Sequence, residues 1–143
     1  MTAYESLNRV RDGVYAYERL LDRIAYLEAL SQRVTPVLSG MPKGSAKQGQ
    51  TDEPWAALAD YKQKCEEQIA QHVRDCQSLE LELTCIRSVR VRMAMMYRYV
   101  DLYTIPRIAD AMSMNERSVY KLLRRGRLIY EKSFEEGFTN GVR

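Results

Sequence analysis

Residues 104–125 read TIPRIADAMSMNERSVYKLLRR, and this stretch predicts two short helices joined by a tight turn. Thr104 is a suitable N-cap for the first helix, and Pro106 fits its first turn, where the missing N–H group costs nothing. The apolar face of this helix is predicted to consist of Ile105, Ile108, Ala109 and Met112. The small side chain of Ala109 leaves room for another helix to cross close by.

The second helix of the pair is expected to begin after Asn115, which can act as its N-cap, and to continue to Arg125. We expect Met114 to be buried in the turn, and Val119 and Leu122 to point inward from the second helix. A capped helix, a three-residue turn and a second helix in this pattern are typical of the helix-turn-helix unit. In that unit the second helix enters the major groove of DNA, with its N-terminal residues nearest the bases.

The charge distribution supports a polyanionic partner for the C-terminal part. The chain of 143 residues carries a net charge of +3, but residues 87–132 hold 11 Lys and Arg against four acidic residues, whereas residues 1–86 have a net charge of −3. A positive field concentrated in so short a segment is the electrostatic signature of a nucleic-acid-binding surface. The alternative interpretation of the segment is a solvated basic face on a structural helical hairpin.

The side-chain chemistry suggests which residues would contact DNA. Candidate base-reading residues are Glu116, Arg117, Ser118, Tyr120 and Lys121, because arginine and lysine donate to guanine and glutamate accepts from cytosine. Tyr120 is equally consistent with packing. Candidate contacts to the DNA backbone are Thr104, Arg107, Asn115, Arg124, Arg125 and Arg127. Arg98 and Tyr103 are further candidates.

The rest of the chain predicts an all-α protein. One long helix is expected from Thr2 to Gln32, with an apolar stripe of Leu7, Val10, Val14, Tyr17, Leu21 and Ile24. A loop is expected from Val34 to Glu53, followed by a second long helix that starts near Pro54 with Asp52 as N-cap. Two seven-residue series mark its seam: Leu58, Cys65, His72, Leu79 and Ile86, and Ile69, Cys76 and Leu83.

These patterns predict a long antiparallel, coiled-coil-like hairpin over residues 1–86, a DNA-binding domain over residues 87–132 and a tail over residues 133–143. Ser88 is expected to cap a helix that ends near Val100, with Val89, Met93, Met96, Tyr97 and Val100 on its apolar stripe. A second copy of the chain could join the hairpin seam, and a dimer is the favoured homo-oligomer.

The C-terminal segment resembles region 4 of bacterial sigma factors. The resemblance rests on RYVD at 98–101, YT at 103–104, IA at 108–109 and NERSVY at 115–120. With the loop sequence LSGMPKG at 38–44, the layout over residues 34–132 resembles phage-encoded late-transcription regulators of the ArpU/RinA type. The resemblance implies promoter DNA binding and contact with host RNA polymerase. Ser113 replaces a glycine common in such turns, so we expect a tighter or shifted turn, and Gly126 is expected to fray or bend the second helix.

The leading hypothesis is therefore a sequence-specific activator of phage late genes that binds double-stranded DNA. A small terminase-like packaging protein also combines such a unit with helical oligomerisation segments, and its closed ring would be distinguished from a dimer by mass in solution. A third hypothesis is a protein-interaction module that never binds DNA. The sequence offers no catalytic constellation, metal site, cofactor motif, membrane span or secretory signal, and we expect a non-enzyme in the bacterial host cytoplasm.

Overall fold

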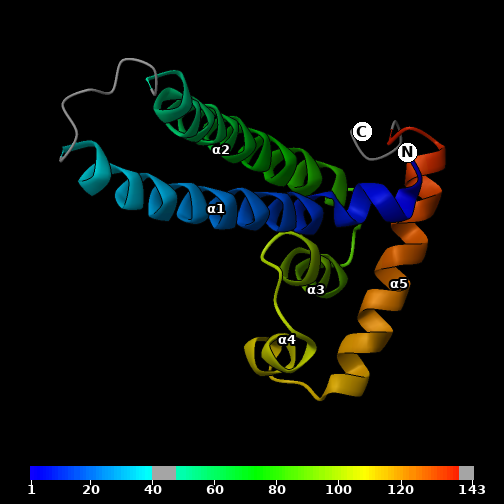
Figure 1. The fold of residues 1–143 in the computed structure, drawn as a ribbon. Coiled ribbons are helices and arrows are strands. Elements are labelled where there is room, and N and C mark those ends of the chain that lie inside the picture. The colour runs from blue at the N-terminus through cyan, green and yellow to red at the C-terminus, as the bar shows by residue number, and fades with distance from the viewer. Residues whose placement is uncertain (40–47, 139–143) are drawn as a thin grey trace. The chain divides into compact units, whose positions relative to one another are not determined.

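The computed structural model describes residues 1–39 and 48–138 and is all-α over these ranges (Figure 1). Its five helices are α1 (Ala3–Ser39), α2 (Gln48–Leu83), α3 (Val89–Tyr99), α4 (Ile105–Met112) and α5 (Glu116–Glu135). The long helices α1 and α2 pack antiparallel, and the three shorter helices pack together. The all-helical fold and the antiparallel pair are thus confirmed. None of the helices described in these ranges is long and apolar enough to cross a membrane.

Both long helices exceed their predicted limits. α1 continues beyond Gln32 to Ser39, and α2 starts at Gln48, so the expectation of a loop over all of Val34–Glu53 is wrong for 34–39 and 48–53. Residues 40–47 lie outside the described part. Asp52 does not cap α2, because that helix starts four residues earlier, at Gln48. Proline and glycine in 34–53 suggested breaks, but the flanking helices continue through part of this sequence, as helical context often overrides single-residue propensity.

The chain divides into two compact units. The first combines Met1–Asp12 with His72–Arg143, and the second is Gly13–Gln71. This division differs from the expected boundary between residues 86 and 87, because the first turns of α1 and the last turns of α2 belong with α3, α4 and α5. A capping box starts α1: Thr2 Oγ1 accepts from the Glu5 N–H at 3.2 Å, and Glu5 Oε2 accepts from the Thr2 N–H at 2.7 Å. The second of these bonds holds the pKa of Glu5 below its ordinary value.

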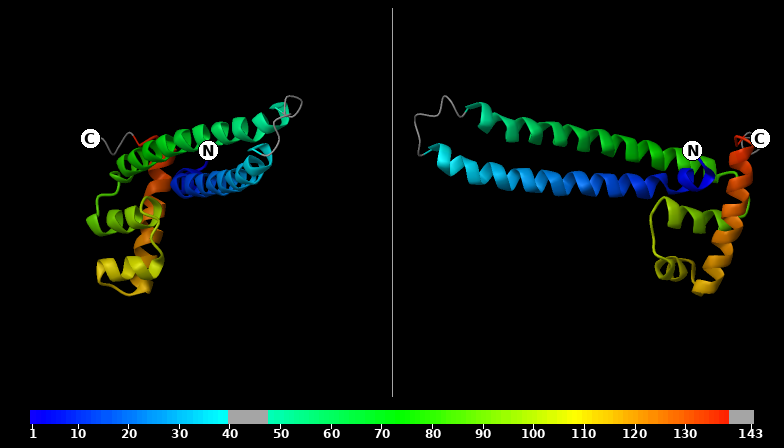
Figure 2. Two further views of the ribbon diagram at one scale, coloured as in Figure 1. Left: turned by 60° about the vertical axis from the view of Figure 1, so that its left-hand side comes forward. Right: turned by 45° about the vertical axis from the view of Figure 1, so that its right-hand side comes forward.

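One hydrophobic core holds the first unit together. It joins the start of α1, the end of α2 and all three short helices through Leu7, Val10, Leu79, Leu83, Ile86, Val91, Ala94, Met95, Val100, Ile105, Ile108, Ala109, Val119, Leu123 and Tyr130. The first turns of α1 lie beside the C-terminal half of α5, as the two views of Figure 2 show. Phe134 and Phe138, in the segment predicted as the tail, pack against this core.

The buried face of α3 differs in part from the predicted one: Val100 is buried as expected and Met96 and Tyr97 are half-buried, but the other two predicted residues are not. Val91, Ala94 and Met95 are buried, whereas Val89 and Met93 are 57% and 41% exposed. The prediction assumed a single stripe on one side of the helix. In the structure α3 contacts both α4 and α5, so its buried arc lies on another part of its surface.

The helix does not fray at Gly126, contrary to one of the two expectations for this residue. α5 runs on to Glu135, and Gly126 is buried where α5 crosses α3. A Cβ atom at this position would lie 2.5 Å from Cγ and Sδ of Met95 and 3.2 Å from Cγ1 of Val91. Glycine is therefore required for the close approach of the two helices.

The second unit consists of parts of α1 and α2 alone. Leu27 and Ser31 from α1, and Leu58 and Cys65 from α2, are buried there. Ser31 donates to the carbonyl of Leu27 at 2.9 Å, which satisfies its buried hydroxyl. The Leu58 and Cys65 positions confirm the first seven-residue series in this unit. Leu21 and Ile69, both expected on apolar faces of the hairpin, are instead 43% and 48% exposed.

Candidate nucleic-acid interface

The connection between α4 and α5 is a defined turn. Ser113 adopts the left-handed conformation (φ 55°, ψ 47°), its N–H group donates to the carbonyl of Asp110, and the N–H group of Met114 donates to the carbonyl of Ala109 at 3.0 Å. This is the Schellman pattern, which normally uses glycine at the left-handed residue. Ser113 thus adopts the conformation that glycine would adopt. The expectation of a tighter or shifted turn at this serine is therefore wrong.

Three predicted helix caps are present. Ser88 Oγ accepts from the Val91 N–H, Thr104 Oγ1 from the Arg107 N–H, and Asn115 Oδ1 from the Ser118 N–H at 2.8 Å. The cap at Asn115 fixes the direction in which α5 leaves the turn. Thr104 and Asn115 are two of the expected contacts to the DNA backbone, and their side chains are used in capping. A phosphate at either site would therefore meet N–H groups of the helix rather than a free side chain.

The packing of α5 decides which of its residues face solvent. Val119, Leu123, Gly126 and Tyr130 form its buried face. Leu122 and Met114, both expected to be buried, are only half-buried. On α5 the residue that points into the core is Leu123, one position after Leu122. The side chains on the opposite face are therefore free to meet a large partner.

That opposite face carries most of the predicted base-reading residues. Arg117, Lys121 and Arg124 follow one another at steps of four and three residues, which places them on one side of the helix. All three are exposed, and Tyr120 beside them is 55% exposed, so the structure shows it as a surface residue and not as a core residue. Glu116 is also exposed, whereas Ser118 is half-buried.

Among the residues that the structure describes, the cations of this face form no salt bridge. The salt bridges found among residues 1–39 and 48–138 join Arg9, Arg11, Lys62 and Lys64 to acids, and none involves α5. Arg117, Lys121, Arg124 and Arg125 therefore make the exposed surface of this part of α5 positively charged. An uncompensated row of cations at the start of a helix attracts anions, and the free N–H groups of the first turn add to the attraction.

Three residues considered for DNA contact also link α3 to α4. The guanidinium of Arg107 lies 3.7 Å from the centre of the Tyr103 ring, and that ring stacks on Tyr97 at 5.1 Å. Arg98 donates to the carbonyl of Tyr103 at 3.0 Å. Arg98 and Tyr103 are therefore engaged in the link between the helices. Arg107 remains exposed and can contact a phosphate while it stays on the ring.

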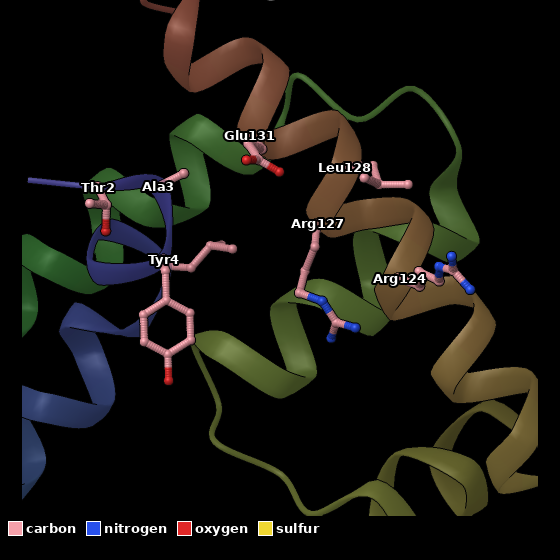
Figure 3. A pocket seen from close by; sticks show the side chains of 8 residues that line it. Thr2, Ala3, Tyr4, Arg124, Arg127, Leu128 and Glu131 are labelled. Carbon is pink, nitrogen blue, oxygen red and sulfur yellow. The ribbon is translucent and has the colours of Figure 1, made fainter.

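Arg124 and Arg127 also line a cleft within the first unit. Its volume is about 350 Å³, and it lies between the first turns of α1 and the second half of α5 (Figure 3). Thr2, Ala3, Tyr4, Leu7, Leu128 and Glu131 complete the lining. Arg127 thus lies on the flank of α5 that faces α1, and Arg124, the last residue of the row that starts at Arg117, lines the same cleft. No sequence pattern points to this cleft, because it joins residues more than a hundred positions apart.

A partly buried polar network joins α1, α2 and α5. Tyr130 donates to Glu82 Oε2 at 3.0 Å and shares a 2.8 Å hydrogen bond with Ser6, while Arg9 forms a salt bridge with Glu82 at 2.8 Å. Burial raises the pKa of Tyr130 to about 12, since the anion would lose its hydration and lie near the Glu82 carboxylate. The network holds the C-terminal half of α5, and so supports the position of its exposed first half.

Comparison of the chain with models of protein families, with curated proteins and with solved structures gives no match. What the chain can bind must therefore follow from the geometry and chemistry of α4, the turn and α5.

Proposed function

We propose that this protein is a transcription regulator that binds double-stranded DNA through a helix-turn-helix formed by α4, the Ser113–Met114 turn and α5. The observation that carries the proposal is the exposed row Arg117, Lys121 and Arg124 on a helix whose other face is buried in a core. A rigid helix that projects such donors is suited to the major groove, where guanine offers two acceptors to one side chain.

The division of roles follows from position along α5. Arg117 and Lys121 lie in the first half, which enters a groove most deeply in this geometry, and so are assigned to bases. Arg124 and Arg125 lie further along and are assigned to phosphates, together with Arg107 on α4. Glu116 is placed to accept from cytosine N4. Arg127 is assigned a lesser role, since it lies ten residues after Arg117 and outside the row Arg117, Lys121 and Arg124.

The resemblance to sigma-factor region 4 supports a regulator that acts near a promoter with host RNA polymerase, as an activator of phage late genes. Transcription of a template that carries the selected site, with host polymerase and with or without this protein, tests that part separately. An increase in transcript supports activation, whereas a decrease would indicate repression.

Selection from a pool of random duplexes tests DNA recognition. The wild-type protein should enrich one sequence family, and Arg117→Ala should bind the selected duplex with about 1–3 kcal/mol less free energy and a relaxed preference at one base pair. Arg19→Ala, an exposed arginine on α1, serves as the matched control and should bind as the wild type does. Equal loss by Arg117→Ala on selected and random duplexes would show that Arg117 does not read sequence.

A further inference from the structure

Besides Tyr15 and Tyr26, whose hydroxyl groups can reach water, three large apolar side chains are exposed among the described residues of the two-helix unit Gly13–Gln71. Leu21 is 43% exposed, Ile69 is 48% exposed and Trp55 is 51% exposed. Two of them continue the apolar patterns of their helices, so their exposure is not what the sequence predicts for a hairpin complete in itself. A pair of helices has no third layer that could cover them.

A salt bridge and the seven-residue spacing together assign these residues to one flank of the hairpin. Glu28 on α1 and Lys62 on α2 lie 3.6 Å apart, which marks the flank on which both project. Residues seven positions apart return to the same side of a helix in a coiled coil. Leu21 lies seven residues before Glu28, and Trp55 and Ile69 lie seven residues before and after Lys62. We call these five residues the flank surface.

The antiparallel direction orders the flank surface along the hairpin. Because α1 and α2 run in opposite directions, Leu21 and Ile69 lie at one level, on the same side of the Glu28–Lys62 pair, and Trp55 lies on the other side. The surface therefore has a charged centre with apolar groups toward both ends. The two halves of that centre are opposite in charge, with the anion on α1 and the cation on α2.

We propose that the flank surface binds the flank surface of a second copy of this chain, around a twofold axis that runs along the hairpin between Glu28 and Lys62. Such an axis exchanges the two helices and keeps each level, so α1 of one copy lies over α2 of the other. Glu28 then faces Lys62 of the second copy, twice by symmetry. Leu21 faces Ile69 of the second copy in the same way, so both the charges and the apolar groups are matched. An isologous contact of this kind closes at two copies.

The size of the described surface fits a small specific interface. The 20 residues of α1 from Gly13 to Gln32 extend over about 30 Å at about 1.5 Å per residue. Two adjacent helices of about 10 Å width would present roughly 600 Å² on such a flank, or about 1,200 Å² for two copies together, which is the lower end of the range for specific interfaces.

Charge reversal at Glu28 or Lys62 tests whether these two residues interact between two copies of the chain or only within one copy. Glu28→Lys places lysine against Lys62 of the second copy, and Lys62→Glu places glutamate against Glu28 of the second copy. In sedimentation equilibrium without DNA, each variant alone should dimerise roughly tenfold or more weakly than the wild type. An equimolar mixture should recover the dimer, because the lysine introduced in one variant then meets the glutamate introduced in the other. Within each single chain the like charges remain, so a purely internal role predicts no recovery.

Matched neutral variants test the apolar part. Leu21→Gln should weaken the dimer, whereas Tyr15→Gln should not, although Tyr15 is more exposed at 61% and lies six residues from Leu21 on another side of α1. Circular dichroism must show equal helix content in the two variants. A wild-type protein that is monomeric at all concentrations, that forms a ring of more than two copies, or whose charge variants fail to recover on mixing would overturn the proposal. These measurements use no DNA, so their outcome is independent of the proposed function.

Discussion

Ser113 shows how one residue sets the direction of the candidate recognition helix. Its left-handed backbone conformation, with φ 55°, is unfavourable for a residue with a Cβ atom by about 1–2 kcal/mol, yet the turn requires it. Ser113→Gly should therefore raise the free energy of unfolding by up to about 1 kcal/mol, since the greater entropy of unfolded glycine offsets part of the gain. Chemical denaturation measures the change. Ser113→Ala is the control and should show no gain; an equal gain with alanine would mean that backbone strain is not the cause.

Tyr130 connects residues at opposite ends of the sequence through its hydroxyl. Tyr130→Phe should lower the free energy of unfolding at pH 7 by about 1–2 kcal/mol, because Ser6 and Glu82 each lose a partner. The folded-state pKa of about 12 lies above the ordinary value of 10.0, so folding favours the protonated phenol. This contribution is complete below pH 10 and is lost as the pH rises toward 12. The advantage of the wild type over Tyr130→Phe should shrink across that window in urea denaturation, and a constant advantage would contradict the assignment.

At the scale of the elements, the crossing of α3 and α5 depends on Gly126. Gly126→Ala should destabilise the protein by about 1–2 kcal/mol, because the added Cβ meets the fully buried Met95 and outweighs the better helix propensity of alanine. Met95→Ala removes the clashing atoms. The double variant should therefore lose less free energy of unfolding than the sum of the losses in the two single variants. Strict additivity in thermal denaturation would show that the crossing has room for a side chain.

Helix starts in the C-terminal half could be predicted, whereas packing faces could not. Ser88, Thr104 and Asn115 cap helices as expected, because a capping bond joins residues three positions apart and depends on local sequence alone. Val89 and Met93 are exposed although their spacing predicts a buried stripe, since the buried arc of α3 depends on where α4 and α5 lie. The surface cations of α5 could likewise be identified from the sequence. The hydrogen bond between Arg98 and Tyr103, in contrast, could be recognised only in the folded structure.

At the scale of the whole molecule, the division into units follows contacts between distant segments. The hydrogen bond between Ser6 and Tyr130 joins residues 124 positions apart, and no periodicity predicts it. The sequence therefore suggests one boundary near Ile86, while the first turns of α1 in fact complete the core beneath α5. The antiparallel hairpin, by contrast, follows from apolar repeats that either helix displays alone.

The central claim is that the exposed row on α5 binds duplex DNA, and its salt dependence is the most direct test. Affinity for the selected duplex should fall steeply and linearly on a logarithmic plot against salt concentration, because each phosphate contact releases counterions. Arg124→Ala should reduce that slope by about one phosphate contact, whereas Arg19→Ala should leave it unchanged. Binding that is absent, insensitive to salt, or equally affected by Arg19→Ala and Arg124→Ala would contradict the account.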